Sequence, residues 1–285
     1  MEHRIATLGT VLGLALWGCS SSDEGPSPLV PQDGEIDALT YNVAGLPEGL
    51  SGSSPEAYMP LISPLLNGYE LVLVQEDFVY HAELAEDARH PYQSLPKQNY
   101  TMLVHDGLNR FSQWPWPELT RVQWVTCYGS ATTGASDCLA EKGFSLARME
   151  FGDGVTFDVY NFHAEAGGGP EDIVAREAGY EQLIDYVRQH SAGNVVILGG
   201  DTNLHGDDPT DRPLLDQFMA EADLADACET LSCGNDQIDR FFFRGNDVIH
   251  IEPVSWQIAT EFVDANGDDL SDHLAVNVRF AWRTL

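Results

Sequence analysis

Basic side chains are scarce in this sequence. Its 285 residues include 14 lysines and arginines against 45 aspartates and glutamates, which gives a formal net charge of -31 at pH 7. A field of this sign repels polyanions, and basic contacts to phosphate supply most of the affinity of proteins for nucleic acids. A nucleic-acid partner is therefore disfavoured. Much of the acid is expected to be solvated surface, and a saline habitat would account for it equally well.

The apolar start of the chain lacks the length needed to span a membrane. The run Ile5–Trp17 follows Arg4 and is too short to cross a bilayer, and this layout predicts a secretory signal peptide. The run ends in Leu16-Trp17-Gly18-Cys19, which resembles a bacterial lipobox, although Trp17 is unusual there. We therefore expect a lipoprotein signal peptide over residues 1–18, with Cys19 as the lipidated residue. A plain signal peptide is the alternative.

The residues after Cys19 are rich in serine, proline and acid, and they predict a disordered tether over residues 19–35. Ser20 in place of an aspartate favours sorting to the outer membrane, by resemblance to bacterial lipoproteins. The expected location is that of an exported protein, either an outer-membrane lipoprotein or one at the cell surface or in the periplasm. A lipid anchor would make the membrane a partner.

Cysteine is also sparse, with five in the whole chain. Four remain after Cys19, and an even number in an exported chain indicates disulfide bonds. Pairing of Cys127 with Cys138 and of Cys228 with Cys233 closes two short loops. A zinc site is less favoured, because neither pair has C-x-x-C spacing.

Short β-rich runs recur from residue 36 to the end, with helical patterns over Pro55–Leu66 and Glu171–His190. No composition break divides residues 36–285, so we expect one layered α/β domain. The expected strands are Ile36–Tyr41, Leu71–Val74, Val122–Thr126, Phe144–Met149, Phe157–Phe162, Val195–Leu198, Ile238–Phe243, Val248–Trp256 and Leu274–Phe280.

Polar residues capable of chemistry follow many of these strands. A lone glutamate or histidine at a strand end is usually an ordinary surface residue, but six strand ends of this kind in one chain indicate a shared site. The side chains are those of Asn42, Glu76, His163, Asp201, Asn203, Asp239, Asp272 and His273.

These motifs resemble the endonuclease/exonuclease/phosphatase superfamily, and its sphingomyelinase-like bacterial members in particular. The specific pieces are Gly200-Asp201-Thr202-Asn203 and Ser271-Asp272-His273, supported by Gln75-Glu76 and Thr40-Tyr41-Asn42-Val43. The resemblance implies an α/β (α+β) fold, a four-layer sandwich of two mostly antiparallel β-sheets flanked by helices. It also implies cleavage of phosphate esters with a divalent cation, usually Mg²⁺, with Mn²⁺ or Ca²⁺ as alternatives.

The resemblance assigns a role to each residue of the set. Glu76 is the expected metal ligand, supported by Asn42 directly or through water, and Asp272 is expected to complete the cation shell. Magnesium prefers such hard oxygen ligands. His273 is the candidate general base and Asp239 the carboxylate that orients its ring.

The remaining roles concern the phosphate. His163 is expected to contact it and to assist the leaving group, and Asn203 is expected to donate to a phosphate oxygen. Asp201 is expected to orient water or a second cation, with Gly199 and Gly200 allowing a tight turn at the sheet edge. Whether Asp201 or His273 is the base stays open.

The substrate depends on outer features. Trp114 and Trp116 sit in a Trp-Pro-Trp-Pro segment and suit a lipid interface or a choline ammonium group, or they pack on the rim of the domain itself. The leading hypothesis is a monomeric, phospholipase-C-like phosphodiesterase acting on sphingomyelin or a related phospholipid. A secreted nuclease and a non-catalytic surface binding module are the alternatives.

Overall fold

The structure is a computed structural model that describes residue 1, residues 32–234 and residues 237–285. The predicted signal peptide, the lipidated Cys19 and most of the predicted tether therefore lie outside the described residues. The last part of that tether, residues 33–35, is the start of β1 (Asp33–Asn42), where it pairs with residues 281–283 near the C-terminus.

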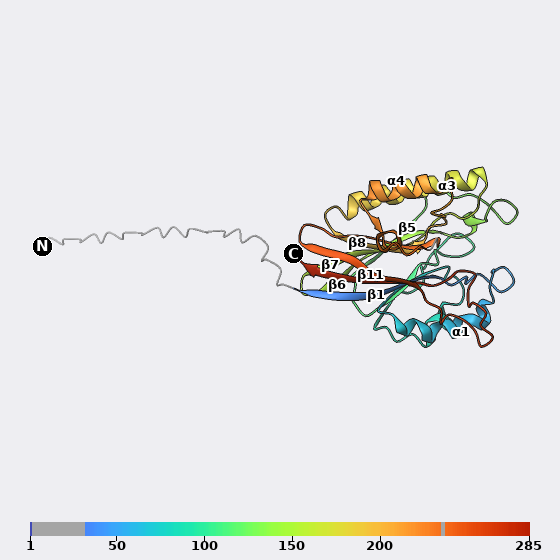
Figure 1. Ribbon diagram of the computed structural model, residues 1–285, viewed down its shortest axis with the longest axis horizontal. Helices are drawn as coiled ribbons and strands as arrows, with labels where there is room; N and C mark the ends of the chain where they lie inside the picture. The colour runs from blue at the N-terminus through green and yellow to red at the C-terminus, as the bar shows by residue number, and fades with distance from the viewer. Residues whose placement is uncertain (2–31, 235–236) are drawn as a thin grey trace.

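Two six-stranded sheets pack face to face (Figure 1). The first has the order β11-β12-β1-β2-β4-β3 and the second the order β5-β6-β7-β8-β10-β9. Among the strands of the described residues, only β1 with β2 and β7 with β8 pair in parallel, so the expectation of mostly antiparallel sheets is confirmed. The strand bounds, after β1, are β2 (Leu71–Gln75), β3 (Tyr92–Gln93), β4 (Asn109–Ser112), β5 (Leu119–Gln123), β6 (Gly143–Gly152), β7 (Val155–His163), β8 (Val195–Asp201), β9 (Ala225–Asp226), β10 (Asp239–Arg244), β11 (Ile249–Ile258) and β12 (Val276–Thr284).

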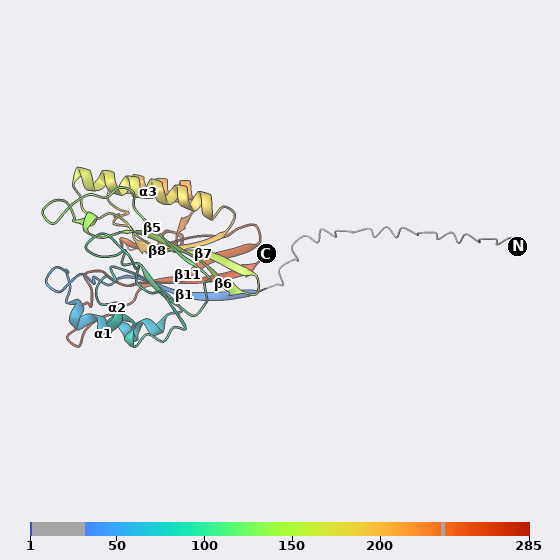
Figure 2. The ribbon, with the colours of Figure 1, turned by 180° about the vertical axis from the view of Figure 1, so that it is seen from behind.

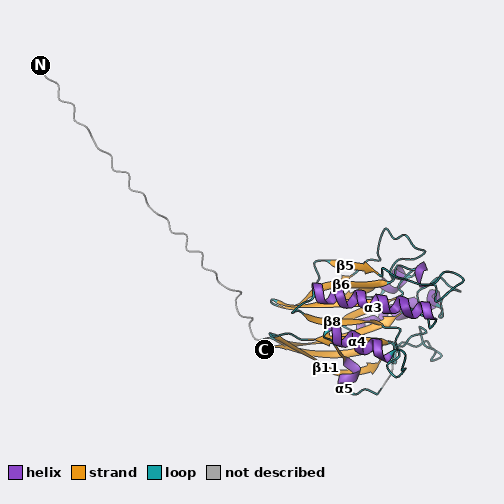
Figure 3. Cartoon of the chain, turned by 90° about the horizontal axis from the view of Figure 1, so that it is seen from above, coloured by secondary structure: helices purple, strands orange, loops and turns teal. Residues whose placement is uncertain are grey.

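Helices cover the outer faces of both sheets and complete the four layers. The helices α1 (Pro55–Leu65) and α2 (His81–Glu86) lie against the first sheet, and α3 (Pro170–His190) and α4 (Arg212–Ala222) against the second (Figures 1 and 2). Figure 3 shows α3 and α4 lying across the second sheet, with α5 (Ala227–Leu231) at its edge. Among the described residues, no helix combines the length and apolar character needed to cross a membrane.

Each sheet is buried on both faces, which explains the apolar runs in its strands. Leu73, Phe157 and Phe280 belong to the core between the sheets. Phe162 and Phe218 belong to the core under α3 and α4, and a third core fills the space between the first sheet and α1. The continuous run Leu71–Val74 thus reflects a strand covered on both sides.

A buried polar network joins the two sheets behind the strand ends that carry the candidate site residues. Asn161 on β7 accepts a hydrogen bond from Gln75 Nε2 (2.7 Å) and donates to the carbonyl oxygens of Val74 and Asn109 (2.9 and 3.0 Å). Buried polar groups of this kind tolerate only one arrangement of partners. The network therefore sets how the two sheets stand relative to each other at that end.

Sequence patterns missed the short elements. The strand β4 reads Asn-Arg-Phe-Ser, which has no run of apolar residues, yet all four residues are buried. Arg110 is fully buried because its guanidinium donates to the carbonyl oxygens of Val159 and Ser145 on the other sheet. The strand predicted at Val122–Thr126 lies earlier, at Leu119–Gln123.

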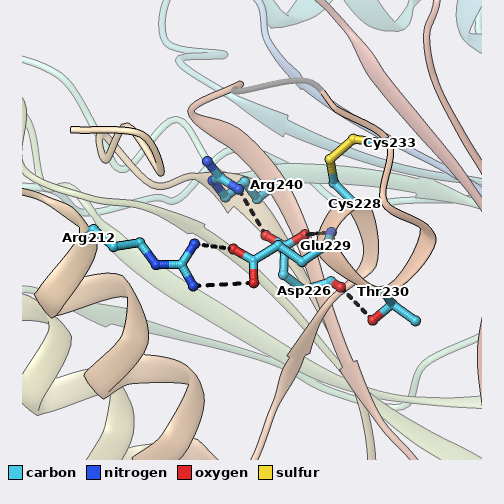
Figure 4. The surroundings of a disulfide bond; sticks show 7 residues. All are labelled: Arg212, Asp226, Cys228, Glu229, Thr230, Cys233 and Arg240. Carbon is cyan, nitrogen blue, oxygen red and sulfur yellow. Dashed lines mark hydrogen bonds and ion pairs between the residues drawn. A yellow bond between two sulfur atoms is a disulfide. The ribbon is translucent and has the colours of Figure 1, made fainter. Parts of the chain in front are cut away.

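Both predicted disulfides are confirmed. The Cα atoms are 5.3 Å apart in the Cys127–Cys138 pair and 5.0 Å apart in the Cys228–Cys233 pair, distances usual for disulfides. Figure 4 shows the second bond beside α5, which Asp226 caps by accepting from the Glu229 backbone N–H. Asp226 also pairs with Arg240 at 3.0 Å, so this corner is fastened to β10, the strand that begins with Asp239.

Candidate active site

The predicted site residues gather at one end of the sandwich. The parallel strands β1 and β2 end there with Asn42 beside Gln75, and β7 and β8 end there with His163 beside Asp201. The antiparallel strand β10 begins at the same edge, with Asp239 opposite Asp201. Strand direction and register therefore bring together residues from five separate parts of the chain.

Asn42 connects the two sheets at the centre of the cluster. Its Nδ2 donates to Glu76 Oε1 at 3.2 Å and to Asp201 Oδ2 at 3.1 Å. The backbone N–H of Ala44 donates to Asn42 Oδ1 at 3.1 Å, and this bond turns the amide so that its nitrogen faces the carboxylates. In this arrangement Asn42 orients Glu76 and Asp201.

His273 and Asp239 form a close pair. His273 Nδ1 lies 2.7 Å from Asp239 Oδ2, and because a carboxylate only accepts, Nδ1 carries the proton. Burial alone would lower the pKa of His273, but the charges of Asp239 and Asp201 raise it to about 10. Burial and the charge of Asp201 raise the pKa of Asp239 to about 6.

The loop that carries His273 is tied to the end of β1. Ser271 Oγ donates to the carbonyl oxygen of Asn42 at 2.7 Å and accepts from the His273 backbone N–H at 3.3 Å. The Ser-Asp-His motif therefore has a structural role for its serine, which holds the histidine over the strand ends.

His163 lies on the other side of Asp201. Its Nε2 is 3.3 Å from Asp201 Oδ2 and 3.8 Å from Glu76 Oε1, and the side chain is buried. Its Nδ1 is buried without a hydrogen-bond partner in the described part of the chain. Burial would raise the pKa of Asp201, yet His163 and His273 together hold it well below its usual range. Asp201 is thus an ionised carboxylate between two imidazoles.

The glycines before Asp201 serve packing, and the expected tight turn at Gly199-Gly200 is wrong. Both lie inside β8. A Cβ on Gly200 would come within 2.0 Å of the carbonyl oxygen of Phe162, and one on Gly199 within 2.5 Å of the Phe241 ring. Only glycine allows the neighbouring strand and ring to approach this closely.

The turn itself comes at Asn203. Its φ is 48°, its backbone N–H donates to Asp201 Oδ1 at 2.9 Å, and its Nδ2 donates to the Ala164 carbonyl oxygen at 3.1 Å. Glu76 also has a positive φ, at 56°, as does Ala44, at 50°. Residues with side chains adopt this left-handed region at a cost, and such strain concentrates at functional sites.

Lys142 is a site residue that sequence reasoning missed. It precedes β6 directly, is buried, and its Nζ lies 2.5 Å from Asp137 Oδ1. Burial would lower its pKa, but Asp137 and Glu76 raise it, with a further contribution from Asp201. Lys142 is therefore a buried positive charge, paired with Asp137, whose field reaches Glu76 and Asp201. The sequence feature that could have drawn attention to Lys142 is the rarity of lysine, because the chain has only two lysines.

Glu165 completes the charged group around Lys142. It is buried two residues after His163, and its Oε2 accepts from the Tyr128 backbone N–H at 3.1 Å. Burial and the charge of Asp137 raise the pKa of Glu165 to about 7. The charge of Lys142 opposes this rise, although the ion pair of Lys142 is with Asp137.

Three predicted site residues are not part of this buried cluster. Asp272 is exposed, and its Oδ2 lies against Gly52, within 2.2 Å of where a Cβ would stand. Trp114 and Trp116 follow β4, whose last residue Ser112 pairs with Leu71 at the start of β2, so they are at the opposite end of the sandwich. Both rings are half-buried against the core between the sheets. The ring centroid of Trp114 lies 4.6 Å from that of Phe151, and the centroid of Trp116 lies 6.2 Å from that of Tyr92.

The donors present fit a hard divalent cation. Within the described residues, Asp201, Asp239 and His273 form a group whose possible ligand atoms all lie within 4.8 Å of one another. Asp239 Oδ2 is engaged by His273 Nδ1, and Asp201 and Glu76, which Asn42 joins, offer further carboxylate oxygens at the same edge. Carboxylate oxygens of this kind are what magnesium prefers.

The chain is similar to known proteins in both sequence and fold. No protein-family model matches the chain. Proteins named Sphingomyelinase from Mycobacterium bovis and Mycobacterium tuberculosis are 34% identical over 280 residues, which cover 90% of this chain and 54% of those proteins. The chain thus spans about half the length of the curated relatives it matches.

Solved structures share the fold. Sphingomyelinase C from Streptomyces griseocarneus aligns with a TM-score of 0.64 and 20% identity, covering 86% of this chain and 99% of that one. A beta toxin mutant from Staphylococcus aureus with bound magnesium ions aligns with a TM-score of 0.63 and 16% identity, covering 86% of this chain and 99% of that one. TDP2 of D. rerio, complexed with a single-strand DNA product, aligns with a TM-score of 0.61 and 14% identity, covering 86% of this chain and 98% of that one. These structures share the two-sheet sandwich fold that the resemblance implies for this chain.

Proposed function

We propose that this protein is a metal-dependent phosphodiesterase that hydrolyses sphingomyelin or a related choline phospholipid in the manner of a phospholipase C. The observation that carries the proposal is the convergence of Glu76, Asp201 and the His273–Asp239 pair at one strand edge. The similarity of this chain to proteins named Sphingomyelinase supports a lipid substrate.

Each residue then has a task. Glu76 and Asp201 are the proposed cation ligands, with Asn42 orienting both and Asp272 contributing from outside the cluster. The cation, Mg²⁺ above Mn²⁺ or Ca²⁺, would neutralise phosphate charge and, by its positive charge, favour the neutral form of His273. Asp239 holds the Nδ1 proton of His273, so that Nε2 faces the site and can take the proton of the attacking water.

Charge stabilisation falls to the remaining groups. His163 is buried at the floor of the site and would donate from Nε2 to a phosphate oxygen. The Asn203 amide would turn away from the Ala164 carbonyl oxygen and donate to a phosphate oxygen as well. Lys142 supplies a permanent positive charge that needs no reorganisation when negative charge develops in the transition state.

The nuclease alternative shares this chemistry, and TDP2 structures include a DNA complex. It is less favoured because the net charge of -31 opposes approach of a polyanion. A non-catalytic binding module is also not favoured, because strained backbone and shifted pKa values persist where catalysis would need them. We further propose a monomeric, exported lipoprotein attached through Cys19.

The test compares substrates. The protein lacking residues 1–31 would be assayed on sphingomyelin vesicles and on plasmid DNA, with Mg²⁺ and with a chelator. Cation-dependent release of phosphocholine with intact DNA is expected. Nicked DNA with untouched vesicles would favour the nuclease, and turnover unaffected by chelation would contradict a metal-dependent reaction.

A further inference from the structure

The two histidines of the site are held in different ways. His273 has its ring fixed by Asp239, whose Oδ2 lies 2.7 Å from His273 Nδ1. The corresponding Nδ1 of His163 is buried and has no hydrogen-bond partner among the described residues. A bond at this second ring nitrogen is what usually orients an imidazole. The position of the His163 ring therefore depends on the backbone that carries it.

That backbone lies just beyond the end of a strand ladder. The pairing of β6 with β7 ends at Phe144 and Phe162, one residue before His163. The carbonyl oxygen of His163 accepts a hydrogen bond from the indole Nε1 of Trp124 at 2.8 Å. Trp124 is buried and begins residues 124–142, which join β5 to β6 and which we name the β5–β6 connection. This connection thus holds the chain where the ladder stops.

The same connection also holds the residues that follow His163. Asp137 Oδ2 accepts from the backbone N–H of Ala166 at 2.6 Å. The backbone N–H of Tyr128 donates to Glu165 Oε2 at 3.1 Å. Both carboxyl groups are buried, and hydrogen bonds to a charged acceptor are stronger than neutral ones. Two further bonds therefore fasten the chain within three residues of His163.

A disulfide closes the connection at these two points. Tyr128 directly follows Cys127 and Asp137 directly precedes Cys138, and the Cα atoms of the two cysteines are 5.3 Å apart. Residues 130–134 between them are exposed, so burial does little to hold this part of the loop in shape. A covalent cross-link restricts such a loop. The disulfide therefore keeps both hydrogen-bonding groups where the end of β7 needs them.

A second element holds the same segment from α3. Arg176 is buried, and its Nη1 donates to the carbonyl oxygens of Glu165 and Gly167 at 2.9 and 2.8 Å. These bonds do not involve the β5–β6 connection. Opening the disulfide should therefore loosen the segment and leave it attached to the domain.

We propose that the disulfide-closed β5–β6 connection is the positioning element of His163, with Trp124 as the positioning residue that contacts its backbone. The inference rests on the proposed function for the task of His163 at the phosphate. The placement of the ring can be measured without turnover.

The two disulfides of the chain supply matched variants. Cys127→Ser with Cys138→Ser, the first disulfide variant, opens the β5–β6 connection. Cys228→Ser with Cys233→Ser, the second disulfide variant, opens the loop beside α5 (Figure 4). Trp124→Phe removes the indole N–H and keeps an aromatic ring in the core, so it tests the inference even if the first disulfide variant does not fold. Circular dichroism identifies the folded variants.

The first measurement is the NMR signal of each histidine ring without substrate, assigned with His163→Ala and His273→Ala. The His163 signal should shift or broaden in the first disulfide variant and in Trp124→Phe. The His273 signal should keep its wild-type position in both, because Asp239 holds that ring. In the second disulfide variant the His163 signal should match the wild type.

The second measurement is kcat/KM on soluble p-nitrophenylphosphorylcholine. The first disulfide variant and Trp124→Phe should lose about 10- to 100-fold, since a shift of about 1 Å in a group that acts on the reacting atoms can cost about 100-fold. In a His163→Ala background the same changes should cost less than about twofold, because residues that act through one another are not additive.

An unchanged His163 signal in either folded variant would overturn the inference. An equal loss of kcat/KM with and without His163 would also overturn it, because the connection would then act on the fold in general. If the wild type cleaves no choline phosphodiester, the proposed function fails, and the His163 signal still decides whether the connection positions this ring. The two ideas can therefore be separated.

Discussion

The most direct test of the site is the substitution Asp239→Asn. It removes the negative charge beside His273 with little change in side-chain shape. The carboxylate is buried, and its Oδ2 lies 2.7 Å from His273 Nδ1. At this distance, Coulomb's law with an effective dielectric constant of about 20 gives an attraction of about 6 kcal/mol between unit charges. The amide keeps a dipole toward the ring, and removing a buried charge recovers some desolvation energy, so the net loss is smaller.

We expect kcat/KM of Asp239→Asn on a soluble phosphodiester to fall by about 10² to 10⁴, the range of a general base that has lost its orientation. This corresponds to about 3–5 kcal/mol of transition-state stabilisation. Asp239→Glu should recover part of the loss, because it restores the charge. Circular dichroism would confirm that the variants are folded.

The matched control is Asp158→Asn. Asp158 is also a buried carboxylate in the second sheet, where it accepts from Arg148 at 2.7 Å and Ser191 at 2.6 Å. It pairs with Val196, near the start of β8 and away from the site. Asp158→Asn should lower stability and leave the activity of the folded protein close to the wild type. An Asp239→Asn variant with near-normal activity, alongside an inactive His273→Ala variant, would refute the reasoning.

Three further predictions follow from the geometry. Glu76→Gln should raise the Mg²⁺ concentration for half-maximal activity by about tenfold or more, and an unchanged metal titration would remove Glu76 from the ligand set. Burial and Asp137 raise the pKa of Glu165 from 4.5 to about 7, so its contribution to stability is present at low pH and lost as pH rises through 7. Relative to Glu165→Gln, the free energy of unfolding of the wild type should fall by up to about 3 kcal/mol between pH 4.5 and 8. Urea unfolding at several pH values measures this difference, and the same pH dependence in both proteins would contradict the prediction. Gly200→Ala should cost about 3 kcal/mol, because its Cβ would meet the carbonyl oxygen of Phe162; an unchanged melting temperature would show that the strands can separate.

Local patterns predicted the strands that are buried on both faces. Leu71–Val74 and Val195–Leu198 appear in the structure as β2 and β8, which begin where predicted and end one and three residues later, since continuous apolar runs have few other solutions. By contrast, β4 was missed because Arg110 is buried through hydrogen bonds to the other sheet. That partner is distant in sequence, and no local pattern reports it.

The sequence by itself determined the residue types of the site and where each stands along the chain, because polar groups after apolar strands mark the edge of a sheet. Tertiary structure alone decided which of them meet. It brought Asn42, Glu76, Asp201 and His273 together through strand direction and register, and it added Lys142, whose importance depends on burial. It also placed Trp114 and Trp116 at the remote end, because the antiparallel course of β4 carries the chain away from the site before these residues.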